Sequence, residues 1–457
     1  MFDSTRAVAH LKQSMQGRVT NAPDVVGDAS FDFGRLVTRT PSLVAFPRDP
    51  QDIANLFTYA NRHRIQITTQ GASHTQGGHT LSASGIVLRT DGLDAIVEIN
   101  AEANWALVES GVRWADLIET TLRMGYLPPL VTTNLHTTVG GTHSVGGVGL
   151  ASFRYGSQAD ICLGLEVVRP TGEVVWCSSH TNKELFDHVL CGLGQFGVMT
   201  KLKIPIRRFK PRTVVFNAFC HSLEQFTDAI RRIVANGCPG IRGLAGMIVE
   251  SSSESTRYVL RCTAESTPCE GSQDRSITEL LHDTTLHMAE ADTRHIVLSG
   301  LGKRIEKPQW DKSSVDPGFH CILPSTNADC SIAGILSALS SSSTGLNMVE
   351  YYLLPVHRRD LTKPLLKAPQ DNVVFVFGCS PSFDRSQESK YRGAMRRFAD
   401  CVQSGNGKHY LIGCTAFRKP DWERHYAESW SAVNRLKQRY DPNRILNQNL
   451  IPYEWRD

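Results

Sequence analysis

The clearest pattern of apolar and polar positions lies between residues 46 and 70. Four apolar side chains recur there at helical spacing and share one face: Ile53, Leu56, Phe57 and Ala60. Asp49 precedes them as a capping residue, and Pro50 suits the first helical turn. Ile65 and Ile67 then alternate with polar residues, as in a strand. The pattern predicts a β-α-β-like unit that ends in a glycine-rich turn.

Further short strands and one helix are expected in the first half of the chain. The strands cover residues 86–89, 96–99 and 105–110. An amphipathic helix over residues 114–124 stops at Gly125. The segment LGLEVVRPTGEVVWCS is typical of a hairpin whose turn lies at residues 170–172.

Beyond Lys210 the pattern mixes strands and helices. Strands are expected at residues 212–219, 245–250, 258–262, 348–354 and 373–378. Helices are expected after a cap at Ser222 and at residues 277–288, 390–402 and 421–440. Loops are expected in the segment SALSSSSTG and at residues 265–276. This order predicts an α+β fold whose second domain holds an antiparallel sheet.

Composition is that of an ordinary globular protein, with 41% hydrophobic and 21% charged residues. A chain of 457 residues is too long for one compact core, so two domains or one large insertion are expected. The net charge of +4 is small and spread along the chain, which gives nucleic-acid binding little support.

The N-terminal residues contain no apolar signal region, and nowhere do eighteen apolar residues run together. Neither secretion nor membrane spanning is indicated, and a cytoplasmic location is the default expectation. The twelve cysteines form no CxxC pair, so they are interpreted as reduced thiols rather than as a disulfide scaffold or zinc site. Cys262 and Cys269 are the one pair close enough in sequence for a bond to be considered.

Three glycine-rich clusters lie in the first domain, in the segments QGASHTQGGH, VGGTHSVGGVG and CGLGQFGVMT. Glycines let a backbone approach a ligand and turn its N–H groups inward, which suits a pyrophosphate. Three such clusters suggest a dinucleotide held by loops, although each alone could be a tight turn between strands. Neither a G-x-G-x-x-G fingerprint nor a Walker loop is present, which disfavours the usual nicotinamide and ATP sites.

The first cluster resembles the R-G-x-G-H-S-x-x-G-Q segment of cytokinin dehydrogenases, which belong to the vanillyl-alcohol-oxidase (PCMH-type) flavoproteins. Three further segments are similar to family blocks in the same order: NLHTTVGGTHSVGGVG, FRYGSQADICLGLEVVRPTGEVVWCS and LFDHVLCGLGQFGVMT. The likeness covers residues 39–208 and resumes in RYDPNRILNQNLIP. It implies an FAD-binding domain over residues 1–208, an inserted α+β substrate domain over 209–420, and a C-terminal return over 421–457.

The resemblance implies that His74 bonds covalently to the 8α-methyl group of FAD. Such a bond fixes the isoalloxazine ring and should raise its potential. In the same comparison a second bond comes from a cysteine where this chain has His136, so a single covalent link is expected. The other positions that match cofactor contacts are Gly71, Ala72, Ser73, Thr75, His79, Thr133, Thr138, Gly141, Ser144, Val148, Val198 and Asn447.

The chain departs from the family at the base. Cytokinin dehydrogenases carry an aspartate in T-D-Y-L that accepts a proton or hydrogen bond from the substrate amine; here that position is Thr133. A threonine hydroxyl can orient a substrate but is no comparable base near neutral pH. His136 and His79 are the histidines considered in its place. Further candidate bases, each more often a packed or surface residue, are Tyr155, Tyr351, Tyr352, His357 and Tyr410.

The histidines of the glycine-rich segments are not expected to bind a metal, because no cysteine or carboxylate accompanies them at ligand spacing. His143 is interpreted as a residue without a chemical role. The function expected from the resemblance is an FAD-dependent oxidoreductase that takes hydride from a C–H next to nitrogen or oxygen of a small molecule. Oxygen or a quinone-like compound would reoxidise it. Two alternatives stay open: an NADPH-fed flavin reductase and a non-catalytic binding module of the same fold.

Overall fold

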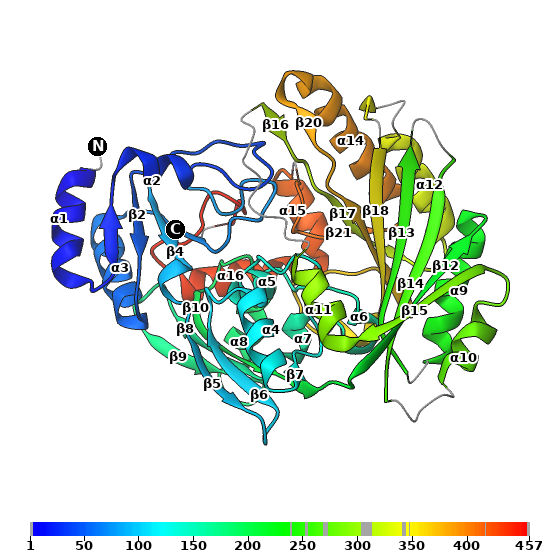
Figure 1. Cartoon of the computed structure of the whole chain (residues 1–457). Coiled ribbons are helices and arrows are strands. Elements are labelled where there is room, and N and C mark those ends of the chain that lie inside the picture. The colour runs from blue at the N-terminus through cyan, green and yellow to red at the C-terminus, as the bar shows by residue number, and fades with distance from the viewer. Residues whose placement is uncertain are drawn as a thin grey trace.

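A computed structural model describes most of the chain: residues 3–237, 240–251, 255–267, 273–302, 313–340, 344–346, 348–415 and 417–454. Two halves lie side by side (Figure 1). One is built around two smaller sheets and contains the N-terminal residues, and the other is built around one large sheet. The C-terminal segment, red in Figure 1, returns to the first half. No helix among the described residues is both long and apolar enough to cross a membrane.

The first sheet has the strand order β1-β2-β4-β3, with bounds Arg18–Thr20, Leu43–Phe46, Ile86–Arg89 and Ile67–Gln70. Strands β2, β4 and β3 run parallel, and helix α3 (Pro50–His63) connects β2 to β3. Asp49 caps α3 by accepting from the backbone N–H of Asp52, and the predicted apolar face of α3 is buried. The β-α-β-like unit is thus confirmed, and it delivers the glycine-rich turn at the end of β3.

The second sheet is antiparallel, in the order β5-β6-β10-β8-β9, with bounds Ile96–Asn100, Trp105–Glu109, Val198–Pro205, Gly164–Val168 and Val174–Cys177. Strands β8 and β9 form the predicted hairpin, and Gly172 takes a φ of 89° in its turn. Helix α4 (Trp114–Arg123) buries one face against the same core. The third glycine-rich segment leads directly into β10.

The large sheet has eight antiparallel strands in the order β15-β12-β14-β13-β18-β19-β17-β21. Their bounds in that order are Thr285–Asp292, Arg212–Cys220, Arg257–Ser266, Ile241–Ser251, Met348–His357, Val373–Cys379, Phe319–Pro324 and Lys408–His409. Helices α9 (Leu223–Asn236), α10 (Gln273–Leu280) and α12 (Ala328–Leu339) lie on the side facing away from the first half (Figure 1). The α+β prediction with an antiparallel second sheet is confirmed.

Two predicted helices are wrong in part. The segment 277–288 begins in α10, but the chain turns after Leu280 and continues as β15, whose backbone pairs with β12 along its length. The expected helix over residues 421–440 is two helices, α15 (Lys419–Tyr426) and α16 (Trp430–Tyr440). The break falls at Ala427, with a φ of 45°. Stacking of the Tyr426 ring between Trp422 and Trp430 accompanies this break.

The predicted loops also need correction. Strand β14 extends to Ser266 and α10 starts at Gln273, so the proposed loop at 265–276 is shorter than expected. Helix α12 includes the first residues of SALSSSSTG, because its apolar face packs on the sheet to Leu339. Cys269 lies outside the described residues, and a bond to Cys262 therefore stays a matter of sequence alone.

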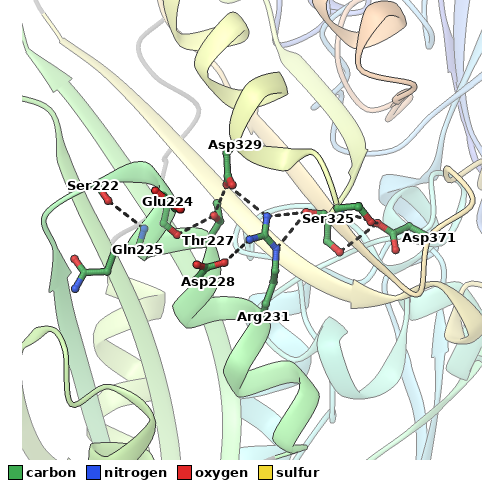
Figure 2. Close-up of polar contacts among 10 residues, drawn as sticks. Ser222, Glu224, Gln225, Thr227, Asp228, Arg231, Ser325, Asp329 and Asp371 are labelled. Atoms are coloured by element: carbon green, nitrogen blue, oxygen red, sulfur yellow. Dashed lines mark hydrogen bonds and ion pairs between the residues drawn. The ribbon is translucent and has the colours of Figure 1, made fainter.

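A network around Arg231 fastens α9 to α12 and to the loop before α12 (Figure 2). The guanidinium donates to the Ser325 carbonyl at 2.8 Å and pairs with Asp228 and Asp329. Thr227 also donates to Asp329. Because the bonds satisfy a main-chain carbonyl and two carboxylates together, the network stabilises the helical layer that supports the large sheet.

We predict that Arg231→Met lowers the free energy of unfolding by about 1–3 kcal/mol, because a carbonyl and two carboxylates lose a charged donor. The midpoint of urea unfolding measures this change. Arg392→Met is the control, since Arg392 pairs with Glu388 on the surface of α14 (Glu388–Ser404) and its loss should cost no more than about 0.5 kcal/mol. Equal midpoints for the two variants would contradict the role given to Arg231.

Candidate functional site

A cleft with a volume of about 810 Å³ lies between the two halves. Its wall in the first half comes from the turn after β3, the residues around α5 (Val139–His143), and the turn before β10. Its opposite wall comes from strands β17, β18 and β19 of the large sheet and the segment around Tyr410. All three glycine-rich segments thus meet at one cavity.

Two hydrogen bonds to Asp32 stabilise the turn after β3. The Asp32 carboxylate accepts from the Thr75 hydroxyl at 2.9 Å and from the backbone N–H of Gly78 at 2.6 Å. Burial raises the pKa of Asp32 to about 6. Ser73 takes a φ of 57°, a left-handed conformation that is rare for a residue with a side chain. These contacts fix the shape of the turn and the position of His74, whose ring stacks on Phe33 at a centroid distance of 5.8 Å.

The second glycine-rich segment contacts this turn. Thr138 caps α5, its hydroxyl accepting from the backbone N–H of Gly141 at 3.1 Å. A Cβ atom on Gly71 would lie 2.6 Å from that same hydroxyl oxygen, so the two segments touch where Gly71 has no side chain. The missing side chain is required for this close approach.

The C-terminal return completes the wall. Asn447 donates to the Gly194 carbonyl at 2.7 Å and accepts from the backbone N–H of Thr69 at 3.0 Å, joining the first and third glycine-rich segments. Its position depends on a buried ion pair between Lys437 and Asp441, whose nitrogen and oxygen atoms lie 2.9 Å apart. The Asp441 carboxylate also accepts from the backbone N–H groups of Ile445 and Leu446.

The structure brings most of the predicted site residues to the cleft. The lining residues include His74, Gly71, Ala72, Ser73, Thr75, His79, Thr133, Thr138, Gly141, Ser144, Val148, Val198 and Asn447. His136 is not among them. The segment before α5 is a turn rather than an extended strand, in which Asn134 accepts from the His136 N–H and Arg113 donates to the His136 carbonyl.

The other candidates divide in the same way. Tyr352 and Tyr410 line the cleft, whereas Tyr155, Tyr351 and His357 do not. Tyr351 points to the opposite face of β18 and packs with the helical layer, as strand alternation requires. His143 is buried against Trp114 and its Nδ1 contacts the Val139 carbonyl, in agreement with a structural role.

The polar cluster on the opposite wall was not predicted. His320 in β17 lies with its Nδ1 3.0 Å from the Tyr352 hydroxyl and its Nε2 3.0 Å from the side-chain oxygen of Gln76. The Gln76 amide donates to the Ser380 hydroxyl at 2.9 Å. Gln76 was visible only as a polar residue near His74, and β17 was not expected as a strand, so nothing in the linear pattern joined these side chains.

Polar atoms that face the cleft allow the fit of FAD to be tested. Within the described residues, Thr69 Oγ1, Ser110 Oγ and His79 Nδ1 are buried, and no hydrogen-bond partner is found for them. Buried polar atoms without partners are costly and commonly await a ligand. Two of these three residues, His79 and Ser110, are next to a glycine in the chain. The site therefore fits a long ligand that carries polar groups along its length.

Burial also sets the charge of the histidines and of one thiol in the cleft. It lowers the pKa of His79 to about 4, with the nearby Arg39 adding to the effect, and it lowers the pKa of His320 to about 3. Both rings are therefore neutral near pH 7. Burial raises the pKa of the Cys379 thiol well above its usual range.

Comparison with known proteins agrees with this site. Residues 41–178 match the model of an FAD binding domain, and residues 335–449 match the model "Cytokinin dehydrogenase 1, FAD and cytokinin binding". Cytokinin dehydrogenase 8 of Oryza sativa is 28% identical over 92% of this chain and 90% of its own length. An uncharacterised oxidoreductase of the fasciation locus of Rhodococcoides fascians is 25% identical over 92% and 95%.

Solved structures share the fold at lower identity. 6-Hydroxy-D-nicotine oxidase from Arthrobacter nicotinovorans aligns with a TM-score of 0.74 at 20% identity, over 95% of this chain and 97% of its own. A BBE-like 1 variant from Physcomitrella patens aligns with a TM-score of 0.77 at 15% identity, over 100% of both chains. The chain is an FAD-binding oxidoreductase of the PCMH type. Within that class it is cytokinin-dehydrogenase-like.

We predict that Gly71→Ala lowers the flavin content of the purified protein, because the added Cβ forces the turn after β3 away from Thr138. The ratio of flavin absorbance to protein absorbance measures the loss. Gly27→Ala is the matched control, since nothing lies within 4 Å of a Cβ at that position. Full flavin content in Gly71→Ala would show that the contact between the two segments does not shape the cofactor site.

Proposed function

We propose that this enzyme carries FAD on His74 and oxidises a small amine or alcohol by removing hydride from the carbon next to nitrogen or oxygen. The observation that carries the proposal is the place of His74: a constrained turn presents it to a cleft that all three glycine-rich segments line. Asp32 and Phe33 hold this turn and the ring, so His74 is positioned before any ligand arrives.

The cradle residues would hold the cofactor by backbone and hydroxyl groups. Gly71 to Thr75 would donate to the pyrophosphate, and Thr138, Gly141 and Ser144 would follow from the second segment. Thr69, Ser110 and His79 offer polar atoms that need partners. Bound FAD supplies a two-electron acceptor for hydride, with oxygen or a quinone-like compound as the subsequent oxidant.

The opposite wall suits a partly apolar substrate. Leu354, Ile412 and the rings of Tyr352 and Tyr410 face the cleft, and Glu350 lies exposed on the same face of β18. Thr133 also lines the cleft, and it offers a hydroxyl where the cytokinin dehydrogenases have a carboxylate. The substrate is therefore proposed to be an amine other than a cytokinin, or an alcohol, because the proton acceptor that serves the cytokinin dehydrogenases is replaced.

The enzyme is expected in the cytoplasm.

The covalent link is tested by denaturing the protein. Wild-type protein should keep its flavin in an acid precipitate and give a fluorescent band on a denaturing gel, and His74→Ala should lose that band while releasing any bound flavin into the supernatant. His180→Ala is the control, because His180 is an exposed loop residue. A fluorescent band in His74→Ala would place the link on another residue. No band in wild type would favour the reductase alternative.

The substrate class is tested by anaerobic bleaching of the flavin with adenine-side-chain amines, other amines and alcohols. Wild-type protein should bleach faster with other amines or alcohols than with the adenine compounds. Thr133→Asp should raise the rate with the adenine-side-chain amines by up to about 10²–10⁴-fold, the contribution typical of a positioned general base. Thr133 is exposed to the cleft, so the carboxylate can be accommodated. Rapid bleaching of wild type by cytokinins would refute the argument from Thr133.

A further inference from the structure

In the large sheet, Tyr352 and His320 contact each other across a glycine of the strand that lies between their own two strands. Gly378 of β19 pairs with Tyr352 of β18 on one side and with His320 of β17 on the other. Paired residues share a face of the sheet, so both side chains rise on the face that lines the cleft. Because Gly378 has no side chain, the Tyr352 hydroxyl reaches His320 Nδ1 at 3.0 Å over the middle strand.

The imidazole ring is held in one orientation. A Cβ atom on Gly378 would lie 2.3 Å from His320 Nδ1, one on Gly413 would lie 2.7 Å from its Cδ2, and one on Gly318 would lie 2.7 Å from its Nε2. The ring is thus enclosed by backbone at three glycines. With an exposed fraction of 5% and a stacked Tyr352 ring beside it, His320 has little freedom to rotate.

The hydrogen-bond partners assign the tautomer of this ring. The Gln76 side-chain oxygen only accepts, so His320 Nε2 carries the hydrogen toward it at 3.0 Å. The Ser380 hydroxyl lies 3.3 Å from the same Nε2; it accepts from the Gln76 amide nitrogen and can also accept from the Nε2–H. Nδ1 then holds a lone pair and accepts from the Tyr352 hydroxyl. The hydroxyl oxygen of Tyr352 keeps its own lone pairs for a group in the cleft.

We propose that Tyr352 and His320 together accept the proton that the substrate loses, in place of the family aspartate. This inference rests on the proposed function. Bound FAD would supply the acceptor for the hydride that leaves the substrate C–H bond with its electron pair, while the substrate N–H or O–H proton moves to the Tyr352 oxygen. The Tyr352 proton moves to His320 Nδ1. The substrate is oxidised to an imine or carbonyl compound, the flavin is reduced, and the histidine holds one proton until solvent removes it.

The neighbouring groups are less suited to this role. Burial raises the pKa of the Tyr410 hydroxyl above its usual range, against the smaller lowering effect of the Gly147 and Val148 backbone N–H groups. Burial lowers the pKa of His320 to about 3 and raises the pKa of Tyr352 well above its usual range. The resting pair is therefore neutral, with Nδ1 accepting from the hydroxyl, and the ring holds a proton only transiently, while the substrate is losing its own. Glu350 is the one carboxylate among the described lining residues, and it stands two residues before Tyr352 on the same face of β18. Glu350 is therefore the rival base that an experiment must separate from the pair.

Gln76 gives the pair its relation to the cofactor. It lies two residues after His74 in the turn that would carry FAD, and its side chain bonds directly to His320. Gln76 therefore links the turn that bears His74 directly to the imidazole, whose position the three glycines also define. Gln76 is a positioning residue in this scheme, whereas Tyr352 touches the substrate.

The test compares Tyr352→Phe, His320→Gln, the double variant and Glu350→Gln, with Tyr155→Phe as a control outside the cleft. Anaerobic bleaching by the fastest compound of the panel is followed at substrate saturation. Tyr352→Phe and His320→Gln should each slow bleaching by about 10²–10⁴-fold. The double variant should be no slower than either single variant, since both remove one unit. Tyr155→Phe should stay near the wild-type rate, and Glu350→Gln should slow bleaching less than either variant of the pair.

Glutamine at position 320 can still accept from Tyr352 and donate to Gln76, but it cannot take up a proton. A normal rate in His320→Gln would therefore overturn proton acceptance by the pair and leave His320 a structural residue. Loss of rate confined to Glu350→Gln would assign the base to Glu350 and overturn the proposal equally. The gel fluorescence of each variant reports separately on the link at His74, so a failed link and a failed proton step give different results.

A second measurement needs no turnover. Nitrogen–proton correlation spectra of [¹⁵N]histidine-labelled protein should contain one signal set that vanishes in His320→Gln and shows a protonated Nε2 with a bare Nδ1. Tyr352→Phe should shift the Nδ1 resonance of that ring, because its hydrogen-bond donor is lost. A proton found on Nδ1 would overturn the inference, since the ring would then have no lone pair directed at Tyr352.

Discussion

The hydrogen bond between Gln76 and His320 joins parts of the chain that are 244 residues apart and belong to different halves of the molecule. One partner is in the turn that follows a parallel strand, and the other is in the middle of an antiparallel sheet. The bond is buried, which makes its loss more costly than that of a surface contact. Within the cleft, this bond connects the turn that bears His74 to the wall that bears Tyr352; other bonds that join the halves include the one from the Leu244 N–H to the Leu150 carbonyl.

The first wall has its own costly support. Lys437 and Asp441 are fully buried, and an isolated charge at either place would be strongly unfavourable. The pair is tolerated because Lys437 also donates to the carbonyls of Gln195 and Leu446, and Asp441 accepts from backbone N–H groups. These bonds hold the C-terminal return against the third glycine-rich segment. A segment remote in sequence thus decides where Asn447 meets the cleft.

The local parts of this architecture could be read from the sequence, and the remote parts could not. Helix α3, the strand after it and the turn bearing His74 follow from periodicity, a capping aspartate and glycines, all of which act within a few residues. The strand at Thr285–Asp292 depends on pairing with β12, and the break at Ala427 accompanies aromatic packing. The pairing partner of the strand is remote in sequence. The aromatic contacts at the break join residues four apart, a spacing that suits an unbroken helix equally well.

The site shows the same division. The glycine-rich segments and the family resemblance predicted the residues of the cofactor site. The resemblance also indicated that Thr133 stands where the cytokinin dehydrogenases have an aspartate. His136 was chosen for its place in the sequence, but the chain turns there and directs its backbone to Arg113 and Asn134. His320 was missed because its meaning comes from Gly378, Tyr352 and Gln76, which lie on three other segments.

The burial of Cys379 has a consequence for durability. Peroxide attacks the thiolate form of cysteine, and the fraction of thiolate falls as the pKa rises. Cys379 borders a cleft where electrons would pass to an oxidant, yet burial keeps its sulfur protonated. The same holds for Cys191 and Cys414 nearby in the fold, whose pKa values burial also raises. The apolar packing around the cleft therefore also keeps these sulfur atoms in their less reactive, protonated form.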